Sequence, residues 1–493
     1  MKKPTAVIAV PSICDFYTTP HRLSALGEKI VQQILQRQGW KTRFIHFPNT
    51  ARQVLALPPV LAHLEPCLLP GEFGPTAFFS RYHRFGPTPG QGADIILSEK
   101  PDAVFLSCFA FAYADDTLAL ARQIKKQRPN MPVYAGGAGA SVLPEYFMRA
   151  GCIDTVISGE AEKNLTRFLT GTTAADGAAG SSAKRSDRPD VAIATMKSSK
   201  KGLWLTTALS RGCPRKCTFC ANHLTQGRTF RTVSMDAFLS AIETFPRDIP
   251  IHINFEDDNL LMDKHFFFDV LQAIRQVFPQ VDFSAENGVD YGLLDIETLQ
   301  QLIACGFRQF NLSMASIRPS ILKDTRRWGD PRRLQELLLF LARQNIPSIT
   351  YFICGLAQDT VDTVIQNLQF LFSQPTRVGI SLFYPVPGLS GYENRQTFKA
   401  SASHLCTGSA AFPWSASLTT AQMVTAFRLA RFINLTRKNH YQPEERDLVR
   451  RILKERKLYT YQRTNRKKRM VRPPGLDREM EEGFLGSLAD LGP

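Results

Sequence analysis

The stretch LWLTTALSRGCPRKCTFC (residues 203–220) joins an apolar run to a loop that carries three closely spaced cysteines. Its first seven residues have the composition of a buried strand. The loop then places Cys213, Cys217 and Cys220 in the pattern C-x3-C-x2-C. A disulfide needs two thiols and a tetrahedral metal ion needs four ligands, so three thiols in eight positions require another explanation.

Three thiolates in so short a loop suit an iron–sulfur cluster, in which three irons are ligated and the fourth keeps an open coordination position. Zinc is the alternative, because His223 follows Cys220 by three residues and gives a Cys3His ligand set. Structural zinc sites, however, usually take their ligands from separated pairs rather than from one contiguous loop. The spacing therefore favours an iron–sulfur cluster and leaves zinc open.

The stretch also begins a series of six strand-like runs that alternate with helix-like runs. The expected strands are residues 203–209, 251–255, 281–285, 308–314, 347–353 and 378–384, with helices between them such as 235–245, 296–306 and 330–345. Six strand–helix units predict a partial (β/α)6 TIM-type barrel over residues 203–395. Functional residues of such barrels follow the carboxyl ends of the strands, and the cysteine loop lies at such a position.

A separate α/β alternation occupies residues 1–170 and predicts a doubly wound, Rossmann-like parallel sheet domain. The expected strands are residues 5–10, 42–47, 102–107, 132–137 and 154–159, and the expected helices are 22–38, 115–127, 143–151 and 160–169. An irregular insert rich in Pro, Gly and aromatic residues is expected at 48–100. Small polar residues indicate a linker over 171–202, and a helical, basic C-terminal extension is expected over 396–493.

The cysteine motif and the six strands together resemble the radical S-adenosylmethionine (SAM) enzymes, over roughly residues 200 to 395. The resemblance implies a [4Fe–4S] cluster held by Cys213, Cys217 and Cys220, with SAM bound to the open iron. It also implies reductive cleavage of SAM to a 5′-deoxyadenosyl radical. The partner that this chemistry implies is a one-electron reductant such as flavodoxin or ferredoxin.

Further elements after the strands resemble the family in order and spacing, namely FEDDN (255–259), AENG (285–288), NLSMAS (311–316) and ICGLAQDT (353–360). The residues that this resemblance implies for SAM binding are Phe219, Glu256, Asp257, Asp258, Asn287, Ser313, Ser316, Arg327 and Gly355. This chain departs from the family at Ala315, where many relatives have Glu. The plain alternatives are a solvated acidic loop at FEDDN and a surface arginine at Arg327.

The first domain resembles cobalamin-binding domains in its later half, through GGAGASVLPE (136–145) and DTVISGEAEKNL (154–165). The residues implied for cobalamin are Ser107, Gly136 and Gly137; paired glycines let the backbone approach a nucleotide tail closely. The signature D-x-H-x-x-G, whose histidine ligates cobalt, is absent, since Asp15 and His21 stand at another spacing. The alternative is a domain that keeps the fold without the cofactor.

The activity implied by both resemblances is cobalamin-dependent methylation of an unactivated carbon. Without cobalamin, the expectation is a radical SAM enzyme of another reaction type, such as a rearrangement or cyclisation. The remaining cysteines form no second tight motif, which argues against sulfur insertion. No acid–base pair can be assigned, so the sequence names no catalytic residue and no substrate.

Composition and charge set the remaining expectations. The chain is 44% hydrophobic and 21% charged, and its apolar runs are too short for a signal peptide or a membrane span, so a cytoplasmic protein is expected. Residues 437–472 carry 14 Lys and Arg against 4 Asp and Glu, within a net charge of +16. A zinc-stabilised, basic RNA-binding protein is the alternative of another class. No RNA-binding module is recognisable, so no nucleic-acid partner is expected.

Overall fold

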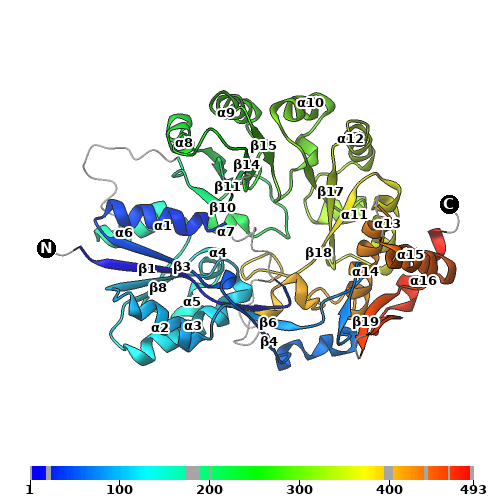
Figure 1. Cartoon of the computed structure of the whole chain (residues 1–493), viewed down its shortest axis with the longest axis horizontal. Helices are drawn as coiled ribbons and strands as arrows, with labels where there is room; N and C mark the ends of the chain where they lie inside the picture. Colours follow the sequence, from blue (N-terminus) through cyan, green and yellow to red (C-terminus); the bar gives the residue numbers. More distant parts are fainter. Residues whose placement is uncertain are drawn as a thin grey trace.

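The computed structural model describes residues 3–17, 24–171, 188–199, 202–392, 403–437, 442–464 and 467–488. Figure 1 shows an N-terminal α/β unit beside an arch of strands with helices on its outer side, and C-terminal helices packed next to the last strands of the arch. Among the described helices, none combines the length and the apolar character needed to cross a bilayer.

The N-terminal unit is a five-stranded parallel sheet in the order β3-β1-β7-β8-β9. Its strands are β1 (Thr5–Val10), β3 (Lys41–His46), β7 (Ala103–Ser107), β8 (Val133–Gly136) and β9 (Thr155–Ile157). The chain direction across the sheet reverses between β1 and β7, and ligands of doubly wound folds bind at the carboxyl ends of strands near such a switch point. The predicted doubly wound sheet is confirmed.

Helices cover both faces of this sheet because consecutive residues of each strand point to opposite faces. Ala6 and Ile8 of β1 pack with α1 (Leu26–Arg37) and α6 (Ala161–Thr170). Val7 and Ala9 pack on the other face. The helices there are α2 (Pro89–Ser98), α3 (Ala114–Gln127) and α5 (Pro144–Met148). A strand that is apolar on both faces is typical of a fully covered parallel sheet.

The arch is a partial barrel of six parallel strands. These are β11 (Gly202–Thr207), β14 (Ile251–Phe255), β15 (Val281–Ser284), β16 (Phe310–Ala315), β17 (Ser348–Cys354) and β18 (Arg377–Leu382). Two isolated parallel bridges, Phe283 with Phe307 and Val289 with Leu312, link the chain segments around β15 and β16. The outer helices are α8 (Met235–Ile242), α9 (Lys264–Val277), α10 (Ile296–Cys305), α12 (Pro331–Arg343) and α13 (Val361–Ser373) (Figure 1). The predicted partial barrel is confirmed.

Several short strands differ from the sequence expectations. The stretch 48–100 contains β4 (Arg52–Leu55) and β6 (Tyr82–Phe85), which form an antiparallel sheet with β2 (Ile13–Asp15). The same stretch contains β5 (Glu72–Phe73), which pairs with β19 (Thr460–Thr464). Strand β19 pairs on its other side with β20 (Lys467–Val471). The edge strand β10 (Ile193–Ser199) lies within the expected linker and pairs with β11. Such short strands are not predicted from local sequence patterns, because their pairing with distant segments of the chain defines them.

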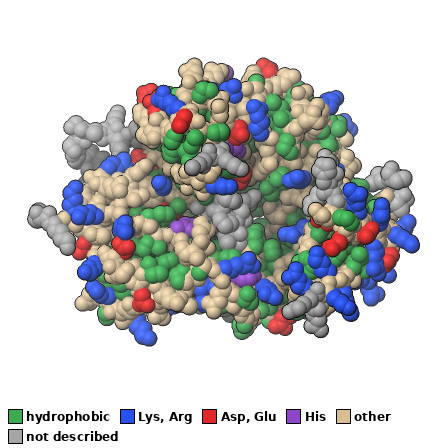
Figure 2. Space-filling model, viewed as in Figure 1, with side chains coloured by type: hydrophobic (Ala, Val, Ile, Leu, Met, Phe, Trp, Pro, Cys, Tyr) green, Lys and Arg blue, Asp and Glu red, His purple; other side chains and the backbone are tan. Residues whose placement is uncertain are grey.

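The C-terminal part is built on α14 (Thr420–Thr436), which begins at the N-cap residue Thr419 with a reciprocal capping box. Asn434 of this helix exchanges two hydrogen bonds with the backbone of Val378 in β18. Two further helices follow, α15 (Pro443–Glu455) and α16 (Arg478–Ser487). Lys and Arg side chains gather over these C-terminal elements, at the right of Figure 2.

Short elements complete the described chain. They are η2 (Phe47–Asn49), η3 (Pro59–Cys67), η4 (Phe111–Tyr113), α4 (Ala138–Val142), β12 (Ser210–Arg211), α7 (Asn222–Thr225), β13 (Arg231–Thr232), η6 (Tyr291–Leu293), α11 (Pro319–Asp324), η8 (Ser403–Leu405) and η9 (Gly408–Ala410).

Candidate active site

The cysteine loop follows β11 at the carboxyl end of the barrel and borders a cavity of about 220 Å³. All three cysteines line this cavity. Six of the nine residues implied for SAM also line it: Phe219, Asp257, Asp258, Asn287, Ser313 and Arg327. The structure therefore brings together side chains from four separate barrel loops at the end where barrel chemistry occurs.

Gly212 fixes the start of the loop, one residue before Cys213. Its φ of +80° is a left-handed conformation, and a Cβ at this position would lie 2.3 Å from the carbonyl oxygen of Thr229. A side chain is therefore excluded both by conformation and by space. Further along the loop, the backbone N–H of Thr218 donates to the carbonyl of Thr325 at 3.1 Å. The loop is thus constrained just before Cys213 and again between Cys217 and Cys220.

Two carboxylates after β14 hold the backbone of the same loop. Asp258 accepts a hydrogen bond from the N–H of Gly212 at 2.9 Å. Asp257 accepts from the N–H of Leu209 at 3.1 Å and from the hydroxyl of Ser210. Burial raises the pKa of Asp257 to about 6 and raises the pKa of Asp258 above its ordinary value. These contacts give both acids a part in shaping the loop, which sequence reasoning did not anticipate.

A chain of charges crosses the floor of the cavity. Asp290 lies 3.1 Å from a guanidinium nitrogen of Arg327 and 3.1 Å from one of Arg215, which stands between Cys213 and Cys217. Arg327 also donates to the carbonyl of Ser313 at 3.2 Å and lies 4.0 Å from the Cys217 sulfur. Sequence reasoning singled out Arg327 but missed Arg215 and Asp290; the place of Arg215 inside the motif was the available signal.

The cysteine side of the cavity fits a cluster. Asn259 donates from Nδ2 to the Cys213 sulfur at 3.7 Å. Burial, and then the charges of Cys217 and Cys213, raise the pKa of the Cys220 thiol. Within the described ranges, no three His, Cys, Asp or Glu side chains converge on a single metal ion. The His223 Nδ1 lies 3.1 Å from the Cys220 carbonyl.

Three residues implied for SAM do not line this cavity. The Glu256 carboxylate accepts a hydrogen bond from the Ser24 hydroxyl at 2.7 Å. Ser316 is buried and hydrogen-bonded to the side chain of Asn367, and the N–H of Gly355 donates to Asp359 at 2.8 Å. The SAM contacts of all nine residues stay predictions.

A second cavity, of about 190 Å³, lies between the N-terminal sheet and helices α1 and α6. Ser107, Gly136 and Gly137 line it, as the cobalamin resemblance implies. A Cβ on Gly137, whose φ is +91°, would lie 2.7 Å from the carbonyl oxygen of Cys108, whereas a Cβ on Gly136 would meet no atom closer than 3.4 Å. This glycine cradle and the apolar walls fit the planar base of a cobalamin tail.

Glu28 of α1 adds a buried carboxyl group to the wall of this second cavity. Burial raises the pKa of Glu28, while a hydrogen bond with the Ser107 side chain opposes that shift. A protonated carboxyl can donate a hydrogen bond to a ligand as well as accept one. Sequence reasoning missed Glu28 because its helix position gives no sign of what it faces.

The far wall of the second cavity comes from the barrel side. Arg211, Thr225 and Gln226, which flank the cysteine motif, line it. An ion pair between Arg231 and Glu160, with one N–O distance of 2.9 Å, joins the same two units. The segment from 211 to 226 therefore borders the cysteine cavity on one side and the glycine-cradle cavity on the other.

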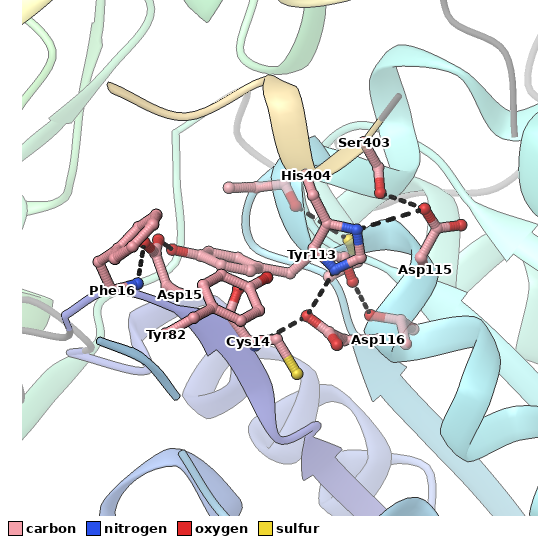
Figure 3. A network of polar contacts seen from close by, with 12 residues as sticks. Cys14, Asp15, Phe16, Tyr82, Tyr113, Asp115, Asp116, Ser403 and His404 are labelled. Atoms are coloured by element: carbon pink, nitrogen blue, oxygen red, sulfur yellow. Dashed lines mark hydrogen bonds and ion pairs between the residues drawn. The ribbon is translucent and has the colours of Figure 1, made fainter. Parts of the chain in front are cut away.

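A buried polar network lies where the first loop of the N-terminal unit meets residues 403–409 (Figure 3). Asp15 accepts hydrogen bonds from the hydroxyls of Tyr113, at 2.8 Å, and Ser409. His404 lies 3.8 Å from carboxylate oxygens of both Asp115 and Asp116. Asp15 therefore anchors the C-terminal segment. The residue His21 lies outside the described part of the chain.

Two family models match the chain, the B12 binding domain over residues 87–169 and the radical SAM superfamily over residues 207–371. An uncharacterized methyltransferase of Pyrococcus horikoshii is 24% identical over 306 residues, which cover 56% of this chain and 65% of that protein. Bacteriochlorophyllide d C-12(1)-methyltransferase of Chlorobaculum tepidum is 22% identical over 189 residues, covering 37% of this chain and 41% of that protein. The chain thus spans less than two thirds of either relative.

Two solved structures share the fold. The methyltransferase TsrM from Kitasatospora setae, with cobalamin and a [4Fe-4S] cluster bound, superposes with a TM-score of 0.55 at 14% identity, covering 80% of this chain and 78% of that one. The enzyme OxsB, with aqua-cobalamin and SAM bound, gives a TM-score of 0.51 at 14% identity, covering 80% of this chain and 56% of that one. The chain thus carries a match to the B12 binding domain followed by a match to the radical SAM superfamily, on a fold shared with these two structures.

Proposed function

We propose that this chain is a cobalamin-dependent radical SAM methyltransferase that methylates an unactivated carbon. The observation that carries the proposal is that residues of the segment 211–226 line two separate cavities. One cavity gathers three cysteines, and the other presents a glycine cradle between sheet and helix. A single loop that borders both sites would hold two cofactors close to each other and to one substrate.

The residues that would hold the cluster are Cys213, Cys217 and Cys220, and those facing the cobalamin tail would be Ser107, Gly136 and Gly137. When bound, the cluster with SAM supplies the radical that removes a substrate hydrogen, and cobalamin supplies the methyl group. The protein's own contribution is binding and orientation. Arg327, held by Asp290 beside Cys217, would pair with the SAM carboxylate.

Methyl transfer is favoured over other radical SAM reactions by two lines of support. The B12-binding model matches the part of the chain that forms the glycine cradle. Both curated relatives described above are named methyltransferases. The reaction would also need a one-electron reductant such as a flavodoxin or ferredoxin.

Metal analysis of anaerobically purified protein tests this function. We expect about four iron and four sulfide per chain, as a [4Fe–4S] cluster requires, together with about one cobalt after incubation with cobalamin. Reduced protein should convert SAM to 5′-deoxyadenosine. Colourless protein that holds one zinc and no iron would refute the proposal.

Variants separate the two cofactor sites. Cys213→Ala, Cys217→Ala or Cys220→Ala should lose iron and SAM cleavage but retain cobalt. Gly136→Leu should fill the second cavity without a backbone clash, and so lose cobalt but retain iron. Gly90→Leu, in open space on α2 of the same domain, is the matched control and should retain both metals.

A further inference from the structure

Helix α14 contains Arg428 and Arg431, and Arg437 follows as its C-cap residue. Arg428 and Arg437 have acceptors within the chain. Arg428 is fully buried and forms a two-point ion pair with Glu72, one N–O distance being 3.0 Å. Arg437 donates to the backbone carbonyls of Leu371, at 2.9 Å, and Phe372. Buried guanidinium groups are generally satisfied in this way.

Arg431 differs from its two neighbours on the helix. It is half-buried, and no carboxylate or carbonyl in the described part of the chain accepts a hydrogen bond from its guanidinium. Both oxygens of Glu72, whose charge reaches Arg431, are committed to Arg428. Burial lowers the pKa of Arg431. A cation taken from water without an anionic partner is costly, so such a group indicates a place for an incoming anion.

An aromatic platform adjoins this guanidinium, formed by Tyr17, Phe79 and Phe427. The Cζ of Arg431 lies 4.8 Å from the ring centre of Phe427, one helical turn earlier. Phe427 packs on Phe79, with ring centres 5.4 Å apart, and Phe79 stacks on Tyr17 at 4.9 Å and 8°. The platform thus joins the first loop, the stretch 48–100 and helix α14.

The platform faces the region where the two α/β units meet. Tyr17 is 51% exposed, and Tyr384, in the loop after β18, is 41% exposed. Burial, and then the charge and hydrogen bond of Asp15, raise the pKa of Tyr113, and the charges of Tyr384 and Tyr17 add to this shift. Tyr113 itself bonds to Asp15 in the network of Figure 3. Tyr384 follows the carboxyl end of β18, and functional residues of barrels lie at that end.

We propose that Arg431 and the aromatic platform form a substrate subsite for an anionic group, a carboxylate or phosphate, carried on a planar apolar body. The guanidinium fork matches these anions in geometry, and aromatic walls with one convergent polar group are typical of small-molecule sites. The inference rests on the proposed function, because it names the substrate class of that same site. Arg431 binds and orients the substrate and takes no part in bond making.

The test uses anaerobic holoenzyme and three probes of one shape: 2-naphthoate, 2-naphthyl phosphate and the neutral naphthalene-2-carboxamide. Dissociation constants are measured by equilibrium dialysis. The unaltered protein should bind at least one anionic probe about ten- to a hundredfold more tightly than the amide, the range of a charge-assisted hydrogen-bonded pair. Phe79→Leu should weaken the binding of all three probes by a similar factor.

Arg431→Gln should abolish the preference for the anions, and Arg431→Lys, which keeps the charge without the fork, should retain part of it. Arg446 is an exposed arginine on α15. Arg446→Gln removes the same charge at a distant place and should leave the three dissociation constants unchanged. Equal binding of the acids and the amide by the unaltered protein would overturn the subsite, as would a preference that survives in Arg431→Gln.

Cofactor measurements on the same preparations separate this inference from the proposed function. Arg431→Gln should retain iron, cobalt and SAM cleavage. Loss of cobalt or of SAM cleavage in this variant alone would assign the guanidinium to a cofactor and refute the substrate subsite. Absence of cobalt and SAM cleavage in the unaltered protein would instead refute the proposed function.

Discussion

Asp258 accepts a hydrogen bond from the backbone N–H of Gly212 at 2.9 Å, which ties the loop after β14 to the residue before Cys213. The two residues are far apart in sequence, yet this contact sets the direction in which the cysteine motif leaves the barrel. The geometry of the thiols therefore depends on a carboxylate outside the motif.

Gly212→Ala should lose most of the bound iron. The new Cβ would lie 2.3 Å from the Thr229 carbonyl, so the loop must move and displace Cys213. Gly227→Ala is the matched control, since Gly227 also has a positive φ but has open space around its Cβ position. That control should pay only the left-handed conformational penalty of about 1–2 kcal/mol and keep its cluster. Iron and sulfide assays decide between the two outcomes, and equal iron content in both variants would contradict the expectation.

Asp258→Ala should lower iron occupancy and SAM cleavage without unfolding the barrel. Removing the carboxylate leaves the Gly212 N–H without an acceptor, which costs about 1–3 kcal/mol for a buried donor. Asp258→Asn keeps an acceptor oxygen, so its iron content should lie between those of the unaltered protein and Asp258→Ala. Full iron occupancy in Asp258→Ala would show that the hydrogen bond does not position the loop.

Arg327→Gln should weaken SAM binding about ten- to a hundredfold, because a charge-assisted pair with the SAM carboxylate would be lost. Arg318→Gln is the control, since Arg318 bonds to Gln366 away from the cavity. Binding is measured by dialysis against SAM with the cluster assembled. An unchanged SAM affinity in Arg327→Gln would show that this arginine pairs with Asp290 and supports the cysteine loop but does not bind SAM.

His404 should make stability depend on pH. Burial opposes its charged form, but the hydrogen bond and charge of Asp116 and the charge of Asp115 outweigh this, and the pKa of His404 is raised. A raised folded-state pKa gives a stabilisation that is complete below the unfolded value of about 6.5 and is lost as pH rises through the folded value. Thermal melts of the unaltered protein and His404→Gln should therefore differ most at acidic pH and converge above neutrality. A difference that grows with pH would contradict this assignment.

The elements predicted most accurately from sequence were those that a local pattern defines. The strand expected at 251–255 is β14 itself, because the alternation of side chains along a strand depends on neighbouring residues. The cysteine spacing likewise placed the loop at the carboxyl end of β11. The hairpin β19–β20 was not anticipated, since β5, its partner in the sheet, lies hundreds of residues upstream.

The candidate site was predictable in part for the same reason. Motifs named the three cysteines and six cavity residues, but they could not show that Glu256 bonds to Ser24 or that Asp290 joins Arg215 to Arg327. Such partners come from different loops, and no spacing along the chain encodes them.

The sequence by itself determined the order of strands, the cysteine motif and the paired glycines, because periodicity, turn chemistry and ligand spacing act over a few residues. Only the tertiary structure decided which charges meet. Glu72 lies 356 residues from Arg428 and accepts its hydrogen bonds, and the same packing leaves Arg431 beside the ring of Phe427 without a hydrogen-bond acceptor among the described residues. Whether each arginine finds an acceptor depends on which side chains lie near it in space, and only the packing of distant segments decides that.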